Sequence, residues 1–491
     1  MKRILSAGIP LRVFAVLALL ALALLLAPML KAAQYDVPSA DDYSNGIVTY
    51  RALKETGSVL QMLKAAWNRV YDLWFTWQGT FSAIFLFTLN PMIFGEQYYA
   101  IGPWLILGML LAGIFFLTFT VWTRFYGAER SESCIIAVIW AVLCTQFLPK
   151  ASQGIYWYTG AVYYTFFFGL SAIACAVLMR YILRDEDDRG TGKLIVSALL
   201  LLFIGGGNLV TGLLMTVLLV SMELLLIFLK RDDWKKLLFP CLCYALSFGL
   251  NVAAPGNAER QVFFAQPGML EAVFLSFREV IRSFGEWFSL PVIAPLVLSV
   301  PVLWRAASRT GRQFRFPGLV SLYSFCLVGV MFYPPIYAMT EGSLKNLGRI
   351  TNIIFFGMLF LVLFNLFYWI GWLIRKQILP DRLFPAAAGN RYSLVFLAAC
   401  LVIFSLGMTG IKWFDTTSIS AFRSYRSGQM GNYRHTYKLR LEILKDPEVE
   451  DAVLKRFPYR PYVLFYQELS TDPAENGPVA EWYGKNSVVI Q

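Results

Sequence analysis

The sequence predicts an all-α polytopic membrane protein. Of its 491 residues, 57% are hydrophobic and only 15% are charged, whereas a soluble globular chain carries about 25% charged residues. In addition, apolar runs of about 20 residues, the length that crosses a bilayer, recur along the chain. We expect about eleven transmembrane helices, with residues 1–411 as the membrane domain and residues 412–491 as an extracytoplasmic tail.

The basic character of the chain fits this fold class. The net charge of +12 would suggest nucleic acid as the partner of a soluble protein. Here lysine and arginine gather in the short segments that we predict to be cytoplasmic and are much rarer in the short outer loops, the asymmetry that orients membrane proteins. We therefore expect a multi-pass protein with its N-terminus inside, its tail outside, membrane lipids around it and no nucleic acid as partner.

The first span and the first outer segment come next in the argument. Residues 11–30 are almost continuously apolar, and we interpret them as an uncleaved anchor rather than a signal peptide. The outer segment that follows, residues 33–97, carries apolar residues at helical spacing from Val59 to Trp74, which predicts an interfacial amphipathic helix. Residues 81–94 are apolar but short, and Asn90-Pro91 breaks them.

The remaining spans are read from the later apolar runs. Gly205-Gly206-Gly207-Asn208 divides residues 194–229 into two short spans. The turn-forming Pro255-Gly256-Asn257 is expected to end another span and to open an outer loop that reaches about residue 286. In the tail, residues 437–445 predict a short helix and residues 461–467 a short strand. The other spans are predicted at residues 98–122, 134–148, 157–182, 237–254, 287–304, 319–337, 350–374 and 393–411.

Composition excludes several kinds of function. The only histidine is His435, so a histidine-based triad, a haem or a multi-histidine metal site inside the membrane is ruled out. The seven cysteines all fall inside apolar runs and give no disulfide framework. Few ionisable residues lie deep in any span, Glu223 being the clearest, which counts against a proton-driven pump.

Asp41 and Asp42 in the first outer segment are the first candidates for chemistry. Neighbouring residues do not share a face of a helix or strand, so the pair is not a ready-made carboxylate dyad. One carboxylate can point into a cavity while the other caps the following helix. The alternative is that both are solvated or capping residues.

Cationic and aromatic residues at the outer ends of spans are the second candidates. Lys150, Arg260, Lys345 and Arg349 are placed to bind phosphate, although snorkelling to lipid headgroups is the ordinary alternative. A set of tyrosines and tryptophan around Trp157, beside Gln153, is placed to form a wall for a sugar ring. The alternative is an aromatic belt at the membrane interface.

Several short motifs carry a resemblance to a known family: Asp41-Asp42-Tyr43, Trp77-Gln78-Gly79, residues 153–160 (QGIYWYTG), residues 255–260 (PGNAER) and residues 349–352 (RITN). With the order of spans and outer loop, they resemble the GT-C glycosyltransferases, and more closely a group of poorly characterised bacterial multi-pass proteins related to them. The tail, with Asp472-Pro473 and residues 481–484 (EWYG), also fits that group. The resemblance covers most of the chain.

The resemblance implies an inverting membrane glycosyltransferase of the bacterial cytoplasmic (inner) membrane. It would move a sugar from a polyprenyl-phosphate-linked donor to a cell-envelope glycan (polysaccharide) or lipid acceptor on the outer face. Asp41 or Asp42 would act as base. Some members use a divalent metal, Mg²⁺ or Mn²⁺, for which Asp36, Asp41 and Asp42 are the candidate ligands here.

The same resemblance assigns the other site residues. Arg260, Arg349 and Lys345 would bind the carrier phosphate, and Gln153, Trp157 and Asn257 would contact substrate. One departure affects this carry-over: where the family pattern has Trp-x-Gly-Arg, this chain has Trp77-Gln78-Gly79-Thr80, so a phosphate or acceptor contact there is in doubt.

Two other functions fit part of the pattern. A lipid-linked saccharide transporter or flippase needs no base and predicts cations on helix faces at mid-depth in the membrane. A saccharide polymerase would use similar arginines without needing the aspartate. Both differ from the glycosyltransferase in whether an aspartate of the first outer segment is required.

Overall fold

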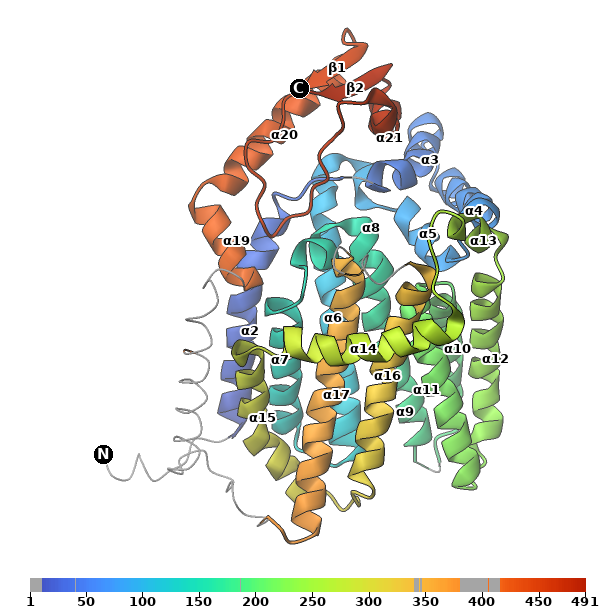
Figure 1. Ribbon diagram of the computed structural model, residues 1–491, viewed down its shortest axis with the longest axis vertical. Helices are drawn as coiled ribbons and strands as arrows, with labels where there is room; N and C mark the ends of the chain where they lie inside the picture. The colour runs from blue at the N-terminus through green and yellow to red at the C-terminus, as the bar shows by residue number, and fades with distance from the viewer. Residues whose placement is uncertain are drawn as a thin grey trace, which may run out of the picture.

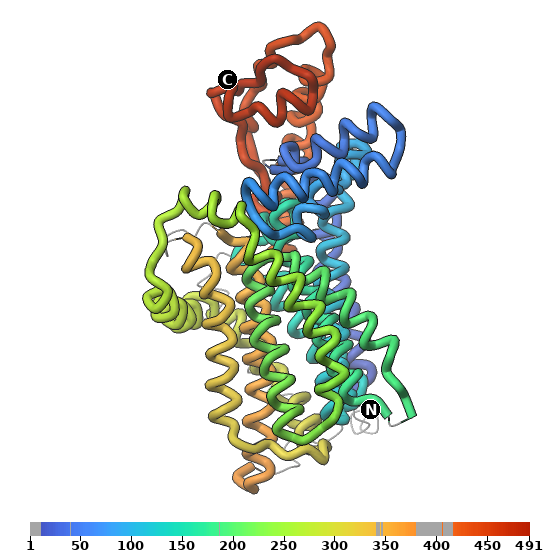
Figure 2. The backbone as a smooth tube through the Cα atoms, turned by 90° about the vertical axis from the view of Figure 1, so that its right-hand side faces the viewer, coloured from blue at the N-terminus to red at the C-terminus, as the bar shows by residue number. Residues whose placement is uncertain are grey.

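The computed structural model describes residues 11–39, 41–185, 187–339, 344, 347–379, 405 and 416–491. Long helices run side by side in a bundle, and a layer of shorter helices covers one end of it (Figure 1). Most of the tail stands beyond this layer, on the side away from the membrane bundle (Figure 2), while its first helix, α19 (Thr417–Arg426), packs against α2 (Leu11–Ala33). We call the end of the bundle that the layer of shorter helices covers the site end, because the candidate residues gather there.

Seven helices of the described residues are long and apolar enough to cross a membrane. An eighth is added if α12 and α13, which meet at a bend of 43°, form one span. The chain is therefore a multi-pass membrane protein by helix length and hydropathy. The seven are α2 (Leu11–Ala33), Glu96–Phe125 (η2, α6 and η3), Tyr158–Ile182 (α8, η5 and α9), α11 (Leu209–Phe228), α15 (Leu290–Arg309), α16 (Pro317–Ala338) and α17 (Gly348–Arg375).

The predicted number of about eleven spans includes helices that fall short of that length. α7 (Arg130–Gln146) has 17 residues and α10 (Thr191–Gly205) has 15, against about 20 for a bilayer core about 30 Å thick. The span predicted at residues 393–411 lies outside the described residues, apart from residue 405. The count of eleven stays a prediction, as does the orientation of the bundle.

The predicted breaks in the chain are found, with one correction. α10 ends at Gly205 and α11 begins at Leu209, as expected from the glycine run. The span before Pro255 does end there, at Val252, but the expected turn is wrong: α13 (Pro255–Gln261) begins at the proline, which suits the first position of a helix. The predicted outer loop is likewise mostly helix, since α14 (Met269–Trp287) occupies its second half. This helix lies across the side of α16 (Figure 1).

The first outer segment folds into a layer of short helices at the site end. It consists of α3 (Asp41–Thr56), α4 (Val59–Thr76), α5 (Phe81–Thr88), η1 (Pro91–Phe94) and η2 (Glu96–Ala100), continued by α6 (Ile101–Thr118) and η3 (Phe119–Phe125). The amphipathic helix expected from Val59 onward is confirmed as α4. Its inner face buries Met62, Ala66 and Val70, and its outer face exposes an apolar stripe, Leu60, Leu63, Trp67, Tyr71 and Phe75. This stripe is the surface that we expect to lie on the membrane.

The tail packs on α3 through its own small core. It contains α19 (Thr417–Arg426), α20 (Gln429–Lys445), η7 (Pro473–Asn476), α21 (Gly477–Tyr483) and two parallel strands, β1 (Asp451–Leu454) and β2 (Ser487–Ile490), with Asp451 opposite Ser487. The helix expected at residues 437–445 is confirmed within α20. The strand expected at residues 461–467 is wrong, since neither strand of the sheet includes this segment. It instead forms a loop that seats Phe465 on Trp157, with ring centroids 4.6 Å apart.

Ion pairs tie the loops together at the opposite end of the bundle. Arg305 lies 3.2 Å from the buried Glu132 carboxylate at the start of α7, and Arg184 lies 2.8 Å from Asp233 at the start of α12 (Asp233–Val252). The described cations predicted to be cytoplasmic thus lie at the end away from α3. Which side of the membrane this end faces stays a prediction.

Candidate functional site

The two adjacent aspartates at the start of α3 have different surroundings. Asp42 is fully buried. One carboxylate oxygen, Oδ1, accepts hydrogen bonds from the backbone N–H (3.2 Å) and the hydroxyl (2.7 Å) of Thr159. The other, Oδ2, accepts from the Tyr99 hydroxyl (2.7 Å) and the Ser39 backbone N–H (3.1 Å). With four donors, Asp42 fastens the start of α3 to the membrane bundle and has no oxygen left for a substrate.

Burial dominates the electrostatics of Asp42. It raises the pKa of the Asp42 carboxyl to about 6, while the hydrogen bonds from Tyr99, Thr159 and Ser39 act in the opposite direction. A desolvated carboxylate with every lone pair occupied is a structural anchor. The sequence left open which aspartate acts in chemistry, and these contacts favour Asp41.

Asp41 faces a cavity of about 340 Å³ at the site end, which we call the Asp41 cavity. Part of its side chain is open to this cavity, while protein surrounds most of the rest. Burial raises the pKa of the Asp41 carboxyl above its usual value, and the guanidinium groups of Arg349 and Arg260 oppose this rise. The lining consists of Asp41, Ser44, Asn45, Arg69, Leu73, Trp77, Gln78, Phe87, Trp157, Thr159, Gly160, Tyr163, Tyr164, Arg260 and Arg349.

Three arginines from three different helices converge on this cavity. Arg349 lies over the ring of Trp157 at 5.0 Å, and Arg260 lies over the ring of Trp77 at 5.4 Å and donates a hydrogen bond to Gln78. The Nε atom of Arg69 is buried and has no hydrogen-bond partner among the described residues. Within the described part of the chain, none of the three forms a salt bridge. The cavity therefore holds an excess of positive charge, which suits an anionic ligand.

Close backbone contacts fix the position of Arg260. Asn257 on the same short helix accepts a hydrogen bond from the Gly79 backbone N–H (3.0 Å) and donates one to the Asn251 carbonyl (2.7 Å). A Cβ atom at Gly79 would lie 1.9 Å from that carbonyl oxygen, so only glycine fits. Asn257, predicted to contact substrate, is instead a residue that holds α13 against the end of α4, and it does not line the cavity.

A second set of polar contacts fixes Arg349 at the start of α17. The backbone N–H of Arg349 donates to the Gln153 side chain (3.1 Å). Asn352, one turn further on, accepts from the Lys150 backbone N–H (2.8 Å) and donates to the Lys150 carbonyl (2.8 Å). Gln153, also predicted to contact substrate, thus positions α17, and Lys150 lies over Tyr462 of the tail at 5.7 Å. Neither lines the cavity.

Aromatic side chains form much of the remaining wall. Of the aromatic set around Trp157, Trp157, Tyr163 and Tyr164 line the cavity, whereas Tyr156 and Tyr158 are not part of its lining. Trp157 directly follows a short π-helical segment, η4 (Ser152–Tyr156), whereas Tyr163 and Tyr164 lie within a second one, η5 (Val162–Phe166). α8 (Tyr158–Ala161) separates the two segments, and η5 leads into α9 (Phe167–Ile182). π-Helical turns of this kind occur often at functional sites, because they redirect side chains from their helical positions.

The chain matches no protein-family model, and no curated protein shows significant similarity to it.

The suggested metal ligands do not form a cation site. Asp42 is saturated by protein donors, and Asp36 is buried, with its Oδ1 accepting from the Val37 backbone N–H (3.2 Å). Burial and the nearby Asp42 raise the pKa of the Asp36 carboxyl, which favours its neutral form. Among the residues that the structure describes, no three acidic, histidine or cysteine side chains are grouped to hold a metal. We assign no step to a metal here.

Arg69 was not singled out from the sequence, and Lys345 lies outside the described residues. A signal for Arg69 was present in the spacing of α4. Met62, Ala66, Arg69 and Leu73 follow one another at intervals of three or four residues, so Arg69 belongs to the inward face of this helix. A cation on the buried stripe of an amphipathic helix needs an anionic or polar partner. Here that face leads to the Asp41 cavity.

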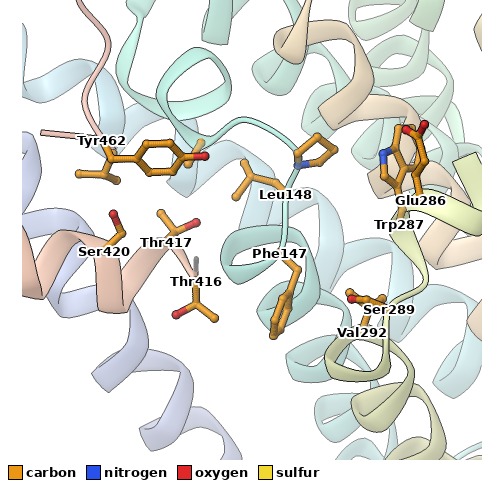
Figure 3. A pocket seen from close by; sticks show the side chains of 13 residues that line it. Phe147, Leu148, Glu286, Trp287, Ser289, Val292, Thr416, Thr417, Ser420 and Tyr462 are labelled. Atoms are coloured by element: carbon orange, nitrogen blue, oxygen red, sulfur yellow. The ribbon is translucent and has the colours of Figure 1, made fainter. Parts of the chain in front are cut away.

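A separate cavity of about 440 Å³ lies near the first residues of α19 (Figure 3). Phe147 and Leu148 separate the hydroxyl groups of Thr416, Thr417 and Ser420 from Glu286 and Trp287 in this view. Its lining shares no residue with the Asp41 cavity. It reaches Thr416, where the described part of the chain resumes, so we assign no function to it.

Proposed function

We propose that the protein is a membrane glycosyltransferase that moves a sugar from a polyprenyl-phosphate carrier to an acceptor hydroxyl. The observation that carries the proposal is the cavity at the site end. Its lining combines one accessible carboxylate, Asp41, with three arginines, Arg69, Arg260 and Arg349, and with several aromatic side chains. A base for the acceptor and cations for the leaving phosphate are the two requirements of this reaction.

The residues divide the reaction between them. The acceptor hydroxyl oxygen attacks the anomeric carbon of the donor sugar while its proton passes to the Asp41 carboxylate. The bond between the anomeric carbon and the phosphate oxygen breaks, and the carrier phosphate leaves with that electron pair. The arginines stabilise the negative charge that develops on the phosphate. A single displacement of this kind inverts the configuration at the anomeric carbon, as expected for a GT-C-type enzyme.

The surroundings of Arg260 suit a lipid-linked phosphate. Val262 and Phe263, which follow α13, are 83% and 73% exposed. Trp77, 40% exposed, lies 6.0 Å from the Phe263 ring. An apolar rim therefore adjoins the cationic cavity, so a prenyl chain can stay in the membrane while its phosphate enters. In the family pattern an arginine stands at the position of Thr80. Arg69 supplies a cation near that motif, since it lines the same cavity as Trp77 and Gln78. Thr80 itself is only 2% exposed and lies outside the lining.

The position of the cations favours transfer over the transport of a lipid-linked saccharide. Transport predicts cations at mid-depth, whereas the arginines of the Asp41 cavity lie at one end of the bundle. A further cavity of about 950 Å³ is lined by Arg124, Arg130, Arg180 and Lys193, and these cations also lie near helix ends. A polymerase would use the arginines but not the base, so it is distinguished by the requirement for Asp41.

The test is donor use by purified protein in lipid nanodiscs, with a labelled polyprenyl-phosphate sugar. Arg69→Gln should raise the KM for the donor by about 10-fold or more, because a hydrogen bond to a charged group contributes about 1.5–3 kcal/mol. Lys64→Gln, which removes an exposed cation from the same helix, is the matched control and should leave the KM unchanged. Equal effects of the two changes would contradict phosphate binding in this cavity.

A further inference from the structure

Asp41 lines a second cavity as well as the arginine-containing one. This tail-side cavity of about 160 Å³ lies between the start of α3 and the tail. Asp41 and Ser44 belong to both linings. The carboxylate of the proposed base therefore stands where the two cavities adjoin, with the arginines on one side only.

The two cavities differ in charge. Among the described residues that line the tail-side cavity, none is lysine, arginine or histidine. They do include the carboxylates of Asp41, Glu468 and Glu475. Glu468 is paired with Arg440 at 2.9 Å, whereas Glu475 is exposed. An anionic ligand would be repelled here, while a neutral or cationic one would not.

The walls of the tail-side cavity are held in place by the protein. The Gln467 backbone N–H donates to the Ser39 hydroxyl (2.7 Å), and Ser39 in turn donates its backbone N–H to Asp42. The side chain of Asn476, only 3% exposed, donates to the carbonyl groups of Ser470 and Val488, at 2.8 Å each. The cavity is thus built into the fold rather than being a gap between mobile loops.

Strong docking keeps the tail against α3. Trp482 stacks on Tyr50 with ring centroids 4.2 Å apart and meets Tyr43 edge-on at 5.7 Å. Arg51 lies 2.7 Å from Glu481. The exposed side chain of Gln467 makes no hydrogen bond to another described residue, so its amide is available as both donor and acceptor.

We propose that the tail-side cavity binds the acceptor, as an uncharged or positively charged hydroxyl-bearing unit about the size of one sugar ring. The inference rests on the proposed function, which needs an acceptor hydroxyl at Asp41 opposite the leaving phosphate. A volume of about 160 Å³ corresponds to about five water molecules, which leaves room for one ring or less. The tail therefore selects the acceptor, and the membrane helices bind the donor.

The test measures binding to each cavity separately, with the full-length protein in nanodiscs. Saturation-transfer NMR follows three probes: methyl glucoside, methyl glucosaminide and methyl glucuronide. Binding of undecaprenyl phosphate is measured in parallel on the same samples. We expect signals from the glucoside and the glucosaminide, and affinity for the glucuronide weaker by about fivefold or more, the factor for one like-charge contact in water.

Two variants of the cavity make the test specific. Gln467→Trp should abolish glycoside binding by filling the cavity and should leave undecaprenyl phosphate binding unchanged. Gln491→Trp, the same change at another exposed tail residue, should alter neither. Glu475→Lys should reverse the charge preference in favour of the glucuronide, whereas Glu442→Lys, on the exposed side of α20, should not.

The outcomes separate this inference from the proposed function. Glycoside binding that survives Gln467→Trp, or a charge preference unaffected by Glu475→Lys, would overturn the tail-side cavity as the acceptor site, even with lipid phosphate still bound. A different outcome would be a wild type that does not bind undecaprenyl phosphate but binds glycosides in a way that Gln467→Trp abolishes. That outcome would contradict the proposed polyprenyl-phosphate donor and would leave the tail-side cavity as a sugar site.

Discussion

Replacing Asp41 by asparagine is the sharpest test of the proposed chemistry. The amide has nearly the same shape as the carboxylate but cannot accept the acceptor's proton. Removal of a general base costs about 100- to 10,000-fold in rate, or about 3–5 kcal/mol of transition-state stabilisation. The Asp41 side chain makes no hydrogen bond to another described residue, so the fold should be unaffected. Donor binding should persist, because the arginines remain.

Asp42→Asn is the matched comparison, because it makes the same chemical change one residue away. Asparagine offers one oxygen where Asp42 uses two. The hydroxyls of Tyr99 and Thr159 can turn to accept from the new amide, but a backbone N–H, from Ser39 or Thr159, cannot. At least one buried donor then loses its partner, at a cost of about 1–3 kcal/mol in folding stability. We expect a lower Tm for Asp42→Asn at about pH 4, where Asp42 of the wild type carries no burial penalty for its charge, with transfer still measurable in the folded protein.

The folding stability of the wild type and that of Asp42→Asn should also respond differently to pH. The folded protein raises the pKa of Asp42 from 3.8 to about 6, so the folded state binds this proton more tightly than the unfolded state. The stabilising contribution of this group is therefore full below about pH 4 and is lost as the pH rises through 6. Asp42→Asn should flatten this part of a plot of Tm against pH.

The assay compares initial rates of sugar transfer in nanodiscs with the Tm of the same preparations. The expected pattern is a large rate loss at unchanged Tm for Asp41→Asn, and a lower Tm with retained transfer for Asp42→Asn. Full activity of Asp41→Asn would refute the role of Asp41 as base. Complete loss of transfer in Asp42→Asn at unchanged Tm would show that the two aspartates have been assigned the wrong way round.

Three further predictions follow from the contacts. Because Asp41 must be deprotonated to act as base, kcat/KM should fall at acid pH. Arg349→Gln should move that fall to higher pH, because it removes a cation that lowers the Asp41 pKa. An unchanged pH profile would contradict the electrostatic coupling of Asp41 and Arg349. Gly79→Ala should lower the Tm strongly, since its Cβ would lie 1.9 Å from a backbone oxygen of α12, whereas Gly108→Ala, with open space around it, should not. Trp482→Ala should cost about 3–5 kcal/mol and release the tail to limited proteolysis, and an equally protected tail would show that this residue does not hold it.

The sequence predicted well those features that depend on local patterns. Runs of apolar residues marked the membrane helices, the glycines at 205–207 marked a break, and the spacing of apolar residues marked α4. These succeeded because length, periodicity and turn chemistry act over a few neighbouring residues. The strand expected at residues 461–467 failed because a strand needs a partner, and this segment packs instead on the aromatic ring of Trp157.

Site residues divided in the same way. The sequence indicated aspartate, arginine and tryptophan at one predicted membrane face as candidates, and Asp41, Arg260, Arg349 and Trp157 do line one cavity. It did not indicate their individual roles. Gln153 and Asn257 looked like substrate ligands, but each hydrogen-bonds to backbone groups of another helix and fixes an arginine in place. Nothing in the local sequence tells such a positioning amide from a binding one.

The sequence by itself determined the class of this protein: a multi-pass membrane protein with carboxylates in the segment after the first span, basic loops and a polar tail. Only the tertiary structure decided that Asp42 is occupied by four donors while Asp41 is open, and that Arg69 joins Arg260 and Arg349. The physical reason is that composition and periodicity act along the chain, whereas most of the surroundings of a carboxylate are supplied by segments distant in sequence. Asp42 meets Thr159 across 117 positions, and no local pattern records that contact.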